Sequence, residues 1–119
     1  MTRIYDYHEL VVWKKSHQLV LDIYSLSRGF PKEELYALTS QLRRAAYSVP
    51  ANIVEGFTRS TSKEAKRFYN IADASLAELR YFLDLSYDLG YVVENHYNLL
   101  ITNIIEVGKI LNGWIKSIK

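Results

Sequence analysis

Three short breaks divide this sequence into four long stretches with helical periodicity. The breaks are Gly29-Phe30-Pro31, Thr61-Ser62-Lys63-Glu64 and Leu89-Gly90-Tyr91. Glycine can end a helix and proline can begin the next one, while Thr61 and Glu64 have the spacing of a capping box. No stretch shows the alternation of apolar and polar residues that is typical of strands. We therefore predict helices over residues 7–29, 33–58, 62–89 and 94–118.

The short connections between these stretches require consecutive helices to run antiparallel. A helix of about 25 residues is about 38 Å long, because each residue adds about 1.5 Å. The chain has 119 residues, of which 49% are hydrophobic, and this is enough for one domain with its own core. The sequence thus predicts an all-α protein, a single domain over residues 1–119 that is an antiparallel up-down four-helix bundle.

Apolar residues three and four apart mark the core-facing side of the second, third and fourth helices. On the second helix they are Leu35, Leu38, Leu42, Ala45, Ala46, Val49, Ile53 and Phe57. On the third they are Phe68, Ala72, Leu76, Leu79, Phe82, Leu83 and Leu89. On the fourth they are Tyr97, Leu100, Ile101, Ile104, Gly108, Leu111, Ile115 and Ile118.

The first helix differs, because its apolar residues fall into two groups on nearly opposite sides. One group is Leu10, Trp13, Val20, Leu21 and Tyr24, and the other is Val12, Leu19, Ile23 and Leu26. A four-helix bundle is expected to bury only one of them, and an apolar stripe in water favours association. We therefore predict a homo-oligomer, with Val12, Leu19, Ile23 and Leu26 at the subunit interface. The alternative is a wide core-facing arc with scattered leucines on the surface.

The composition argues against an enzyme. The chain has no cysteine, which excludes disulfides and thiolate metal sites. Its three histidines lack the spacing of a metal site, and phosphate-loop and nucleophile motifs are absent. We expect no metal, no cofactor and no enzymatic activity. The start of the chain lacks the apolar stretch of a signal peptide, and no run reaches the ~18 apolar residues of a membrane span, so we expect a cytoplasmic protein without membrane contact.

A polar stripe follows a different face of the second helix. Gln41, Arg44, Ser48, Asn52, Glu55 and Arg59 are three or four residues apart and so share that face. One interpretation is a ligand site around Asn52, Glu55 and Arg44. We favour a hydrogen-bonded network at a subunit contact, through Gln41, Ser48, Asn52 and Glu55, because buried polar groups must be paired and such pairing fixes helix register. A solvated face is the third interpretation.

Positive charge gathers in one part of the chain, although the net charge is only +2. Six basic residues between positions 43 and 67 are candidates for binding nucleic acid: Arg43, Arg44, Arg59, Lys63, Lys66 and Arg67. Cations at the start of a helix oppose its macrodipole, so those around the third helix do not stabilise it. An anionic partner would explain them. A solubilising face, with Glu55 and Glu64 as partners, explains the charge equally well.

The segment from Gln41 to Gly56 closely resembles the signature of small proteins encoded in intervening sequences of bacterial 23S ribosomal RNA genes. Matches elsewhere support this resemblance: Leu10 to Trp13, Phe30-Pro31, Ile71 to Leu79, and Leu89 to Tyr91. At Asp73-Ala74-Ser75 the family more often has glycine before the serine. The resemblance implies a four-helix bundle in a ring-like homopentamer, similar to the accessory variability determinant of diversity-generating retroelements, a basic barrel that binds RNA and a reverse transcriptase. It implies no established enzymatic activity.

Two functions fit these observations. The first is a non-enzymatic homo-oligomeric scaffold, a pentamer by resemblance, whose basic residues bind RNA or another nucleic acid. The second is a protein adaptor that docks a partner enzyme such as a reverse transcriptase, with no direct role for nucleic acid.

Overall fold

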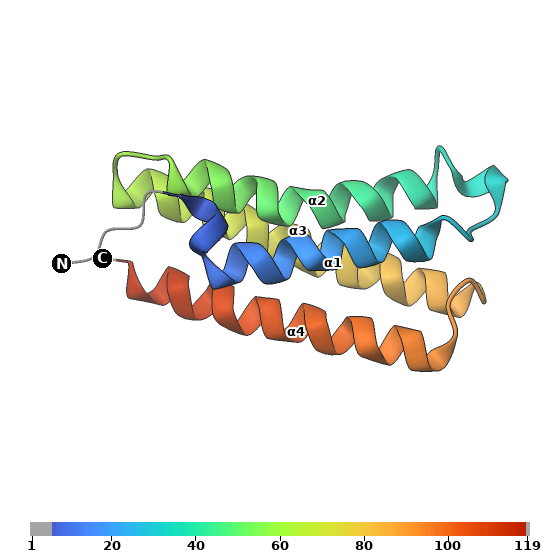
Figure 1. The fold of residues 1–119 in the computed structure, drawn as a ribbon. Helices are drawn as coiled ribbons and strands as arrows, with labels where there is room; N and C mark the ends of the chain where they lie inside the picture. Colours follow the sequence, from blue (N-terminus) through green and yellow to red (C-terminus); the bar gives the residue numbers. More distant parts are fainter. Residues whose placement is uncertain (1–5, 119) are drawn as a thin grey trace.

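Residues 6–118, the part of the chain that the computed structural model describes, form a bundle of four long α-helices and contain no strand (Figure 1). The helices are α1 (Val11–Ser27), α2 (Leu38–Phe57), α3 (Ser62–Asp88) and α4 (Glu94–Ser117), with short 3-10 helices η1 (Tyr7–Glu9) and η2 (Lys32–Glu34). Each long helix packs against its neighbours in sequence, and α1 also packs against α4. The predicted all-α four-helix bundle is confirmed.

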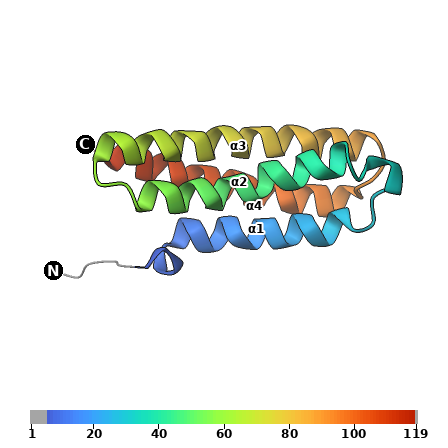
Figure 2. The same ribbon diagram turned by 90° about the horizontal axis from the view of Figure 1, so that it is seen from above.

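The bundle is elongated, with extents of 49 × 26 × 20 Å. The connections alternate between its two ends, so that successive helices run in opposite directions (Figures 1 and 2). One end holds the α2–α3 turn (residues 58–61), the start of α1 and the end of α4, and we call it the α2–α3 end. The opposite end holds the α1–α2 and α3–α4 connections. No helix within residues 6–118 has the length and apolar character needed to cross a membrane.

The second helix begins at Leu38, five residues later than predicted. Residues 32–34 form the 3-10 helix η2, and Ala37 has φ −125° and ψ −105°, outside the helical region. Leu35 therefore leaves the predicted apolar stripe and is 44% exposed. Leu89, which follows the end of α3, is likewise exposed. One half of the predicted capping box is present, since the Thr61 hydroxyl accepts a hydrogen bond of 3.2 Å from the amide of Glu64. The reciprocal hydrogen bond from the Thr61 amide to the Glu64 carboxylate is not formed within residues 6–118, where this carboxylate lies 4.0 Å from Arg67.

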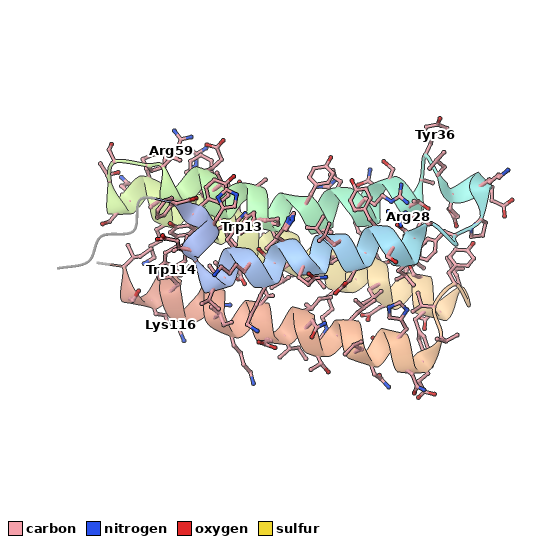
Figure 3. The ribbon with its side chains drawn as sticks, viewed as in Figure 1. Trp13, Arg28, Tyr36, Arg59, Trp114 and Lys116 are labelled. Atoms are coloured by element: carbon pink, nitrogen blue, oxygen red, sulfur yellow. The ribbon has the colours of Figure 1, made fainter. Side chains whose placement is uncertain are left out.

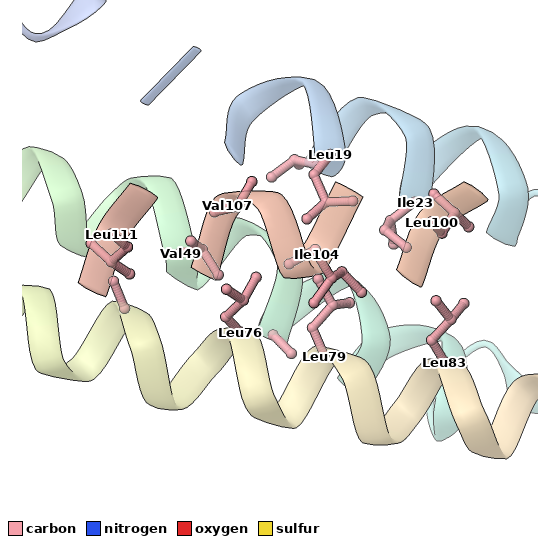
Figure 4. Close-up of a cluster of buried hydrophobic side chains, with 14 of the residues drawn as sticks. Leu19, Ile23, Val49, Leu76, Leu79, Leu83, Leu100, Ile104, Val107 and Leu111 are labelled. Carbon is pink, nitrogen blue, oxygen red and sulfur yellow. The ribbon is translucent and has the colours of Figure 1, made fainter. Parts of the chain in front are cut away.

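The assignment of Val12, Leu19 and Ile23 to a subunit interface is wrong. All three are buried within the chain, with Leu19 2% and Ile23 0% exposed, and Leu26 packs against the same core. Leu19 and Ile23 lie beside Leu100, Ile104 and Val107 of α4 in Figure 4.

The physical reason is the position of α1, which contacts both α2 and α4. A helix held by two neighbours buries a wide arc, so residues of both apolar groups find partners. Leu10 and Val20, from the other group, are also buried, while Trp13 and Tyr24 are half-buried. The first helix therefore has a wide core-facing arc with scattered apolar residues on its surface.

One buried hydroxyl in the core has no partner. Thr39 is buried, and its Oγ1 makes no hydrogen bond within residues 6–118. An unpaired buried hydroxyl costs about 1–3 kcal/mol, so Thr39→Val, which keeps the shape, should raise the free energy of unfolding by about 1 kcal/mol. Urea unfolding measures this. The control is Thr102→Val, because the exposed Thr102 hydroxyl donates to the carbonyl of Asn98 at 2.9 Å and its loss brings no gain. Equal effects of the two changes would contradict the assignment.

Candidate nucleic-acid interface

Four of the six predicted basic residues lie together at the α2–α3 end. Arg59 follows α2, and Lys63, Lys66 and Arg67 lie in the first turns of α3, where their spacing places them on one side of the helix. The guanidinium carbons of Arg59 and Arg67 lie 4.6 and 5.7 Å from the centroid of the Phe68 ring. The half-buried Phe68 therefore holds both arginines, and we call Arg59, Lys63, Lys66 and Arg67 the basic cluster.

Two carboxylates neutralise the cluster in part. Glu55 pairs with Arg59, and Glu64 lies 4.0 Å from Arg67. Lys63 and Lys66 are exposed and form no ion pair with any residue between 6 and 118. Exposed ion pairs contribute about 0–1 kcal/mol, so the two glutamates hold the arginines weakly. The cluster thus keeps an excess of positive charge at the start of α3, where positive charge does not stabilise the helix.

Arg43 and Arg44 do not lie with the other four. Arg43 Nε donates to Ser27 Oγ at 2.8 Å, and its guanidinium carbon lies 4.8 Å from the centroid of the Tyr24 ring, so this side chain joins α2 to α1. Arg44 pairs with Glu78 of α3 at 2.5 Å. Both precede Arg59 by at least 15 residues, about 22 Å along a helix. The predicted surface of six basic residues is therefore reduced to the basic cluster.

The polar stripe of α2 forms three separate groups along the α2–α3 seam. In the middle group, Ser48 Oγ lies 2.8 Å from Ser75 Oγ, and Asn52 Nδ2 donates to the Ser48 carbonyl at 2.8 Å and to its Oγ at 3.0 Å. Gln41 accepts a 3.1 Å hydrogen bond from Arg44, and Glu55 pairs with Arg59. These side chains are paired within one chain and do not form one continuous network, while the predicted subunit contact stays a prediction. Of these polar contacts, only the Ser48–Ser75 contact and the Arg44–Glu78 pair cross from α2 to α3. They fix how α2 and α3 sit against each other.

A pocket of about 260 Å³ opens beneath the α2–α3 turn, next to the basic cluster. Its wall combines aromatic rings, small hydroxyl side chains and one cation, from Gly56, Phe57, Arg59, Ser60, Thr61, Ser62, Ala65, Tyr69, Trp114 and Ile118. The rings of Tyr69 and Trp114 stack with centroids 4.7 Å apart. Figure 3 shows Arg59 and Trp114 at this end of the bundle, while Arg28 and Tyr36 lie at the opposite end.

Tyr69 and Trp114 were absent from the predicted residues. Tyr69 is 3% exposed, and its burial raises the pKa of the phenol to about 12. The sequence did contain a signal, because Tyr69 lies three residues before Ala72 and so continues the buried stripe of α3. The predicted stripe began instead at Phe68, which is half-buried beneath the two arginines.

The backbone of α2 approaches Tyr69 closely at Gly56. A Cβ atom at this position would lie 2.4 Å from Cε1 of the Tyr69 ring. Gly56→Ala should therefore lower the free energy of unfolding by about 1–3 kcal/mol, because the ring must move and disturb its stack with Trp114.

The matched control for this change is Gly113→Ala in α4, where a new Cβ meets nothing within 4 Å. Alanine is the better helix former, so Gly113→Ala should stabilise the protein by about 0.5–1 kcal/mol. Urea unfolding compares the two variants. A Gly56→Ala protein as stable as Gly113→Ala would contradict the close contact.

Comparison with known proteins agrees with this fold. The model of the 23S rRNA-intervening sequence protein family matches residues 8–113. The chain belongs to this family. Among solved structures, it is similar to a protein of unknown function from the S23 ribosomal protein family of Bacteroides thetaiotaomicron, with 25% sequence identity and a TM-score of 0.83 over 90% of this chain and 100% of the other. None of the curated proteins matches.

In this 23S rRNA-intervening sequence protein, the family match includes the basic cluster, Gly56 and Tyr69, and it ends one residue before Trp114. The similarity to the retroelement accessory protein stays a prediction. Residues 6–118 contain no group of three or more histidine, aspartate or glutamate side chains placed to hold a metal ion.

Proposed function

We propose that this protein is a non-enzymatic, homo-oligomeric scaffold that binds RNA or another nucleic acid through the basic cluster. The observation that carries the proposal is the position of Lys63 and Lys66. Both are exposed and have no ion-pair partner in the described part of the chain, and they lie at the start of a helix, where their charge opposes the macrodipole. A bound anion would offset the repulsion between these two lysines and the positive end of the helix macrodipole. Few other features of the fold would do so.

The chemistry of the cluster favours phosphate groups as that anion. Arginine presents a planar fork of donors to phosphate, and Phe68 orders Arg59 and Arg67 by contact with their guanidinium groups. Lysine adds a compact positive charge. The four cations lie on the α2–α3 turn and in the first turns of α3. This arrangement suits a polymer with regularly spaced charges better than a single small anion.

The oligomeric part of the proposal is supported by apolar side chains left on the surface. They occur on all four helices and include Val11, Leu21, Tyr47, Ile71, Tyr81, Leu99 and Ile105. The family resemblance implies a homopentamer. In an oligomer the basic cluster repeats, so that one nucleic acid contacts several copies and binds with higher avidity. Sedimentation velocity tests this part, with assemblies of defined size as the expected result and monomers as the contrary one.

The test of nucleic-acid binding is a fluorescence anisotropy titration with a labelled, structured RNA at two salt concentrations. Tight binding that weakens steeply with salt is expected, because each phosphate neutralised by the protein releases a counterion. Weak binding at low salt would make the basic cluster a solvated charged face and would end the proposal.

A surface at the opposite end of the bundle favours the second candidate, a protein adaptor that docks a partner enzyme. An open groove there is lined by Tyr24, Leu35, Tyr36, Ser40, Arg43 and Tyr47, and Tyr36 is 93% exposed. Tyrosine and arginine, with tryptophan, are enriched among the residues that contribute most to binding at the centres of protein interfaces. Recovery of a partner from a nuclease-treated lysate, and its loss with Tyr36→Asp, would favour this candidate over the first.

A further inference from the structure

The pocket beneath the α2–α3 turn and the basic cluster share one residue. Arg59 lines the pocket, and its guanidinium group also contacts Phe68 beside Arg67. Ser62 and Ala65 line the pocket from the same turns of α3 that carry Lys63 and Lys66. A chain of phosphates that contacts the cluster would therefore hold its next group near the pocket mouth. This inference rests on the nucleic-acid binding proposed above.

The wall of the pocket has two kinds of surface. The half-buried Phe57 and Trp114 supply flat apolar rings, and Ser60, Thr61 and Ser62 supply small hydroxyl groups. The ring of Tyr69 is buried between Gly56 and Trp114. Its volume of about 260 Å³ lies just below the ~300–1,000 Å³ that is usual for pockets of drug-sized ligands. A nucleobase is a smaller group with the same two properties, since its faces stack on aromatic rings and its edges form hydrogen bonds.

The hydroxyl of Tyr69 forms no hydrogen bond to another residue between 6 and 118. Tyr69 is 3% exposed and lines the pocket, and its hydroxyl is not among the fully buried atoms that lack a partner. The hydroxyls of Tyr91 and Tyr97, by contrast, donate to the carboxylates of Glu34 and Asp84. A phenol is protonated near neutral pH, so the Tyr69 hydroxyl is available as a donor.

We propose that this pocket binds one unpaired nucleobase of the RNA whose phosphates contact the basic cluster. The base enters beneath the α2–α3 turn, packs against the Trp114 ring and accepts a hydrogen bond from the Tyr69 hydroxyl through a carbonyl oxygen or ring nitrogen. The protein then prefers single-stranded segments, because a base within a duplex is already stacked and paired.

The experiment compares three ten-nucleotide probes: a single-stranded RNA, an abasic strand with the same phosphates, and an RNA duplex. Trp114 reports on the pocket once Trp13, the second tryptophan of the chain, is changed to phenylalanine. The single strand should bind about tenfold tighter than the abasic strand and change Trp114 fluorescence, because stacking on aromatic side chains strengthens binding by roughly this factor per base. Affinities from anisotropy in the unmodified protein provide an independent comparison.

The variant that isolates the pocket is Tyr69→Phe. It keeps the ring against Trp114 and removes only the hydroxyl, which forms no hydrogen bond within residues 6–118, so the stability of the fold should be unchanged. The affinity for single-stranded RNA should fall about five- to tenfold, while the affinity for the abasic strand should stay the same. If Tyr69 had only a structural role, Tyr69→Phe would change the affinities for the single strand and for the abasic strand equally.

The outcomes separate this inference from the proposed function. If the single strand and the abasic strand bind equally and Trp114 fluorescence does not change, the base pocket is wrong although phosphate binding stands. If neither strand binds, the proposed function fails and the pocket fails with it. Equal binding of single strand and duplex would also overturn the pocket.

Discussion

Changing both Leu19 and Ile23 to lysine should unfold the protein. Both side chains are fully or almost fully buried within one chain, against α4 residues such as Ile104 and Val107. Loss of a large apolar side chain from a core costs about 2–5 kcal/mol, and burial of an unpaired ammonium group adds several more. At two sites the total is about 10–20 kcal/mol, which is as large as the ~5–15 kcal/mol that holds a typical domain folded. Circular dichroism should show the loss of helix.

The control is a lysine pair on the exposed side of the same helix. Val11 and Leu21 are 57% and 50% exposed, so Val11→Lys with Leu21→Lys adds the same charge to α1 without disturbing the core. This variant should keep its helix content. Well-folded monomers of the Leu19 and Ile23 variant would contradict the core assignment and would restore these residues to a subunit interface.

Changing both Lys63 and Lys66 to glutamate should weaken RNA binding by about 100-fold at ~0.1 M salt, because two phosphate contacts become two repulsions. The fold should be as stable as before or slightly more stable. Neither lysine has an ion-pair partner among residues 6–118, and negative charge near the start of α3 is favourable to its macrodipole. Binding and stability therefore move in opposite directions, which separates a lost contact from an unfolded protein. Anisotropy and urea unfolding measure the two effects.

The matched control is Arg28→Glu with Lys32→Glu. These two residues are also exposed, form no ion pair within the described part of the chain, and lie at the opposite end of the bundle, where Figure 3 labels Arg28. The change in net charge is the same. An equal loss of RNA affinity in the two variants would mean that overall charge, rather than the basic cluster, governs binding.

The sequence predicts the helices well because their boundaries depend on local chemistry. Thr61 caps α3 through a hydrogen bond to the amide of Glu64, three residues away, and such a contact is visible in the order of residues. The spacing of Leu42, Val49 and Ile53 likewise predicts burial along α2. The start of α2 is harder to predict from the sequence, because it depends on the backbone after Pro31, which forms the 3-10 helix η2.

The incorrect predictions depend on how many other helices pack against each helix, which is a property of the tertiary structure. Helical spacing separates the apolar residues of α1 into two groups, but it does not show that α2 and α4 together cover a wide arc of this helix. It also cannot show that Arg43 contacts Tyr24 of α1 and that Arg44 pairs with Glu78 of α3, because these partners lie on other helices. Helical spacing cannot predict the pocket for the same reason, because Tyr69 and Trp114 are 45 positions apart in the sequence and come into contact only in the folded chain.

The predicted absence of a signal peptide concerns the first residues, of which residues 1–5 lie outside the described part of the chain. Cytoplasmic localisation, a homopentamer and a reverse transcriptase partner stay predictions.

The most direct test of the basic cluster is the slope of log affinity against log salt concentration for the native protein and for the variant with glutamate at Lys63 and Lys66. Each neutralised phosphate contributes about 0.7 to this slope on a single strand. The variant should therefore have a slope smaller by about 1.4, together with weaker binding at every salt concentration. Equal slopes for the two proteins would mean that Lys63 and Lys66 do not contact RNA, and the proposed interface would be wrong.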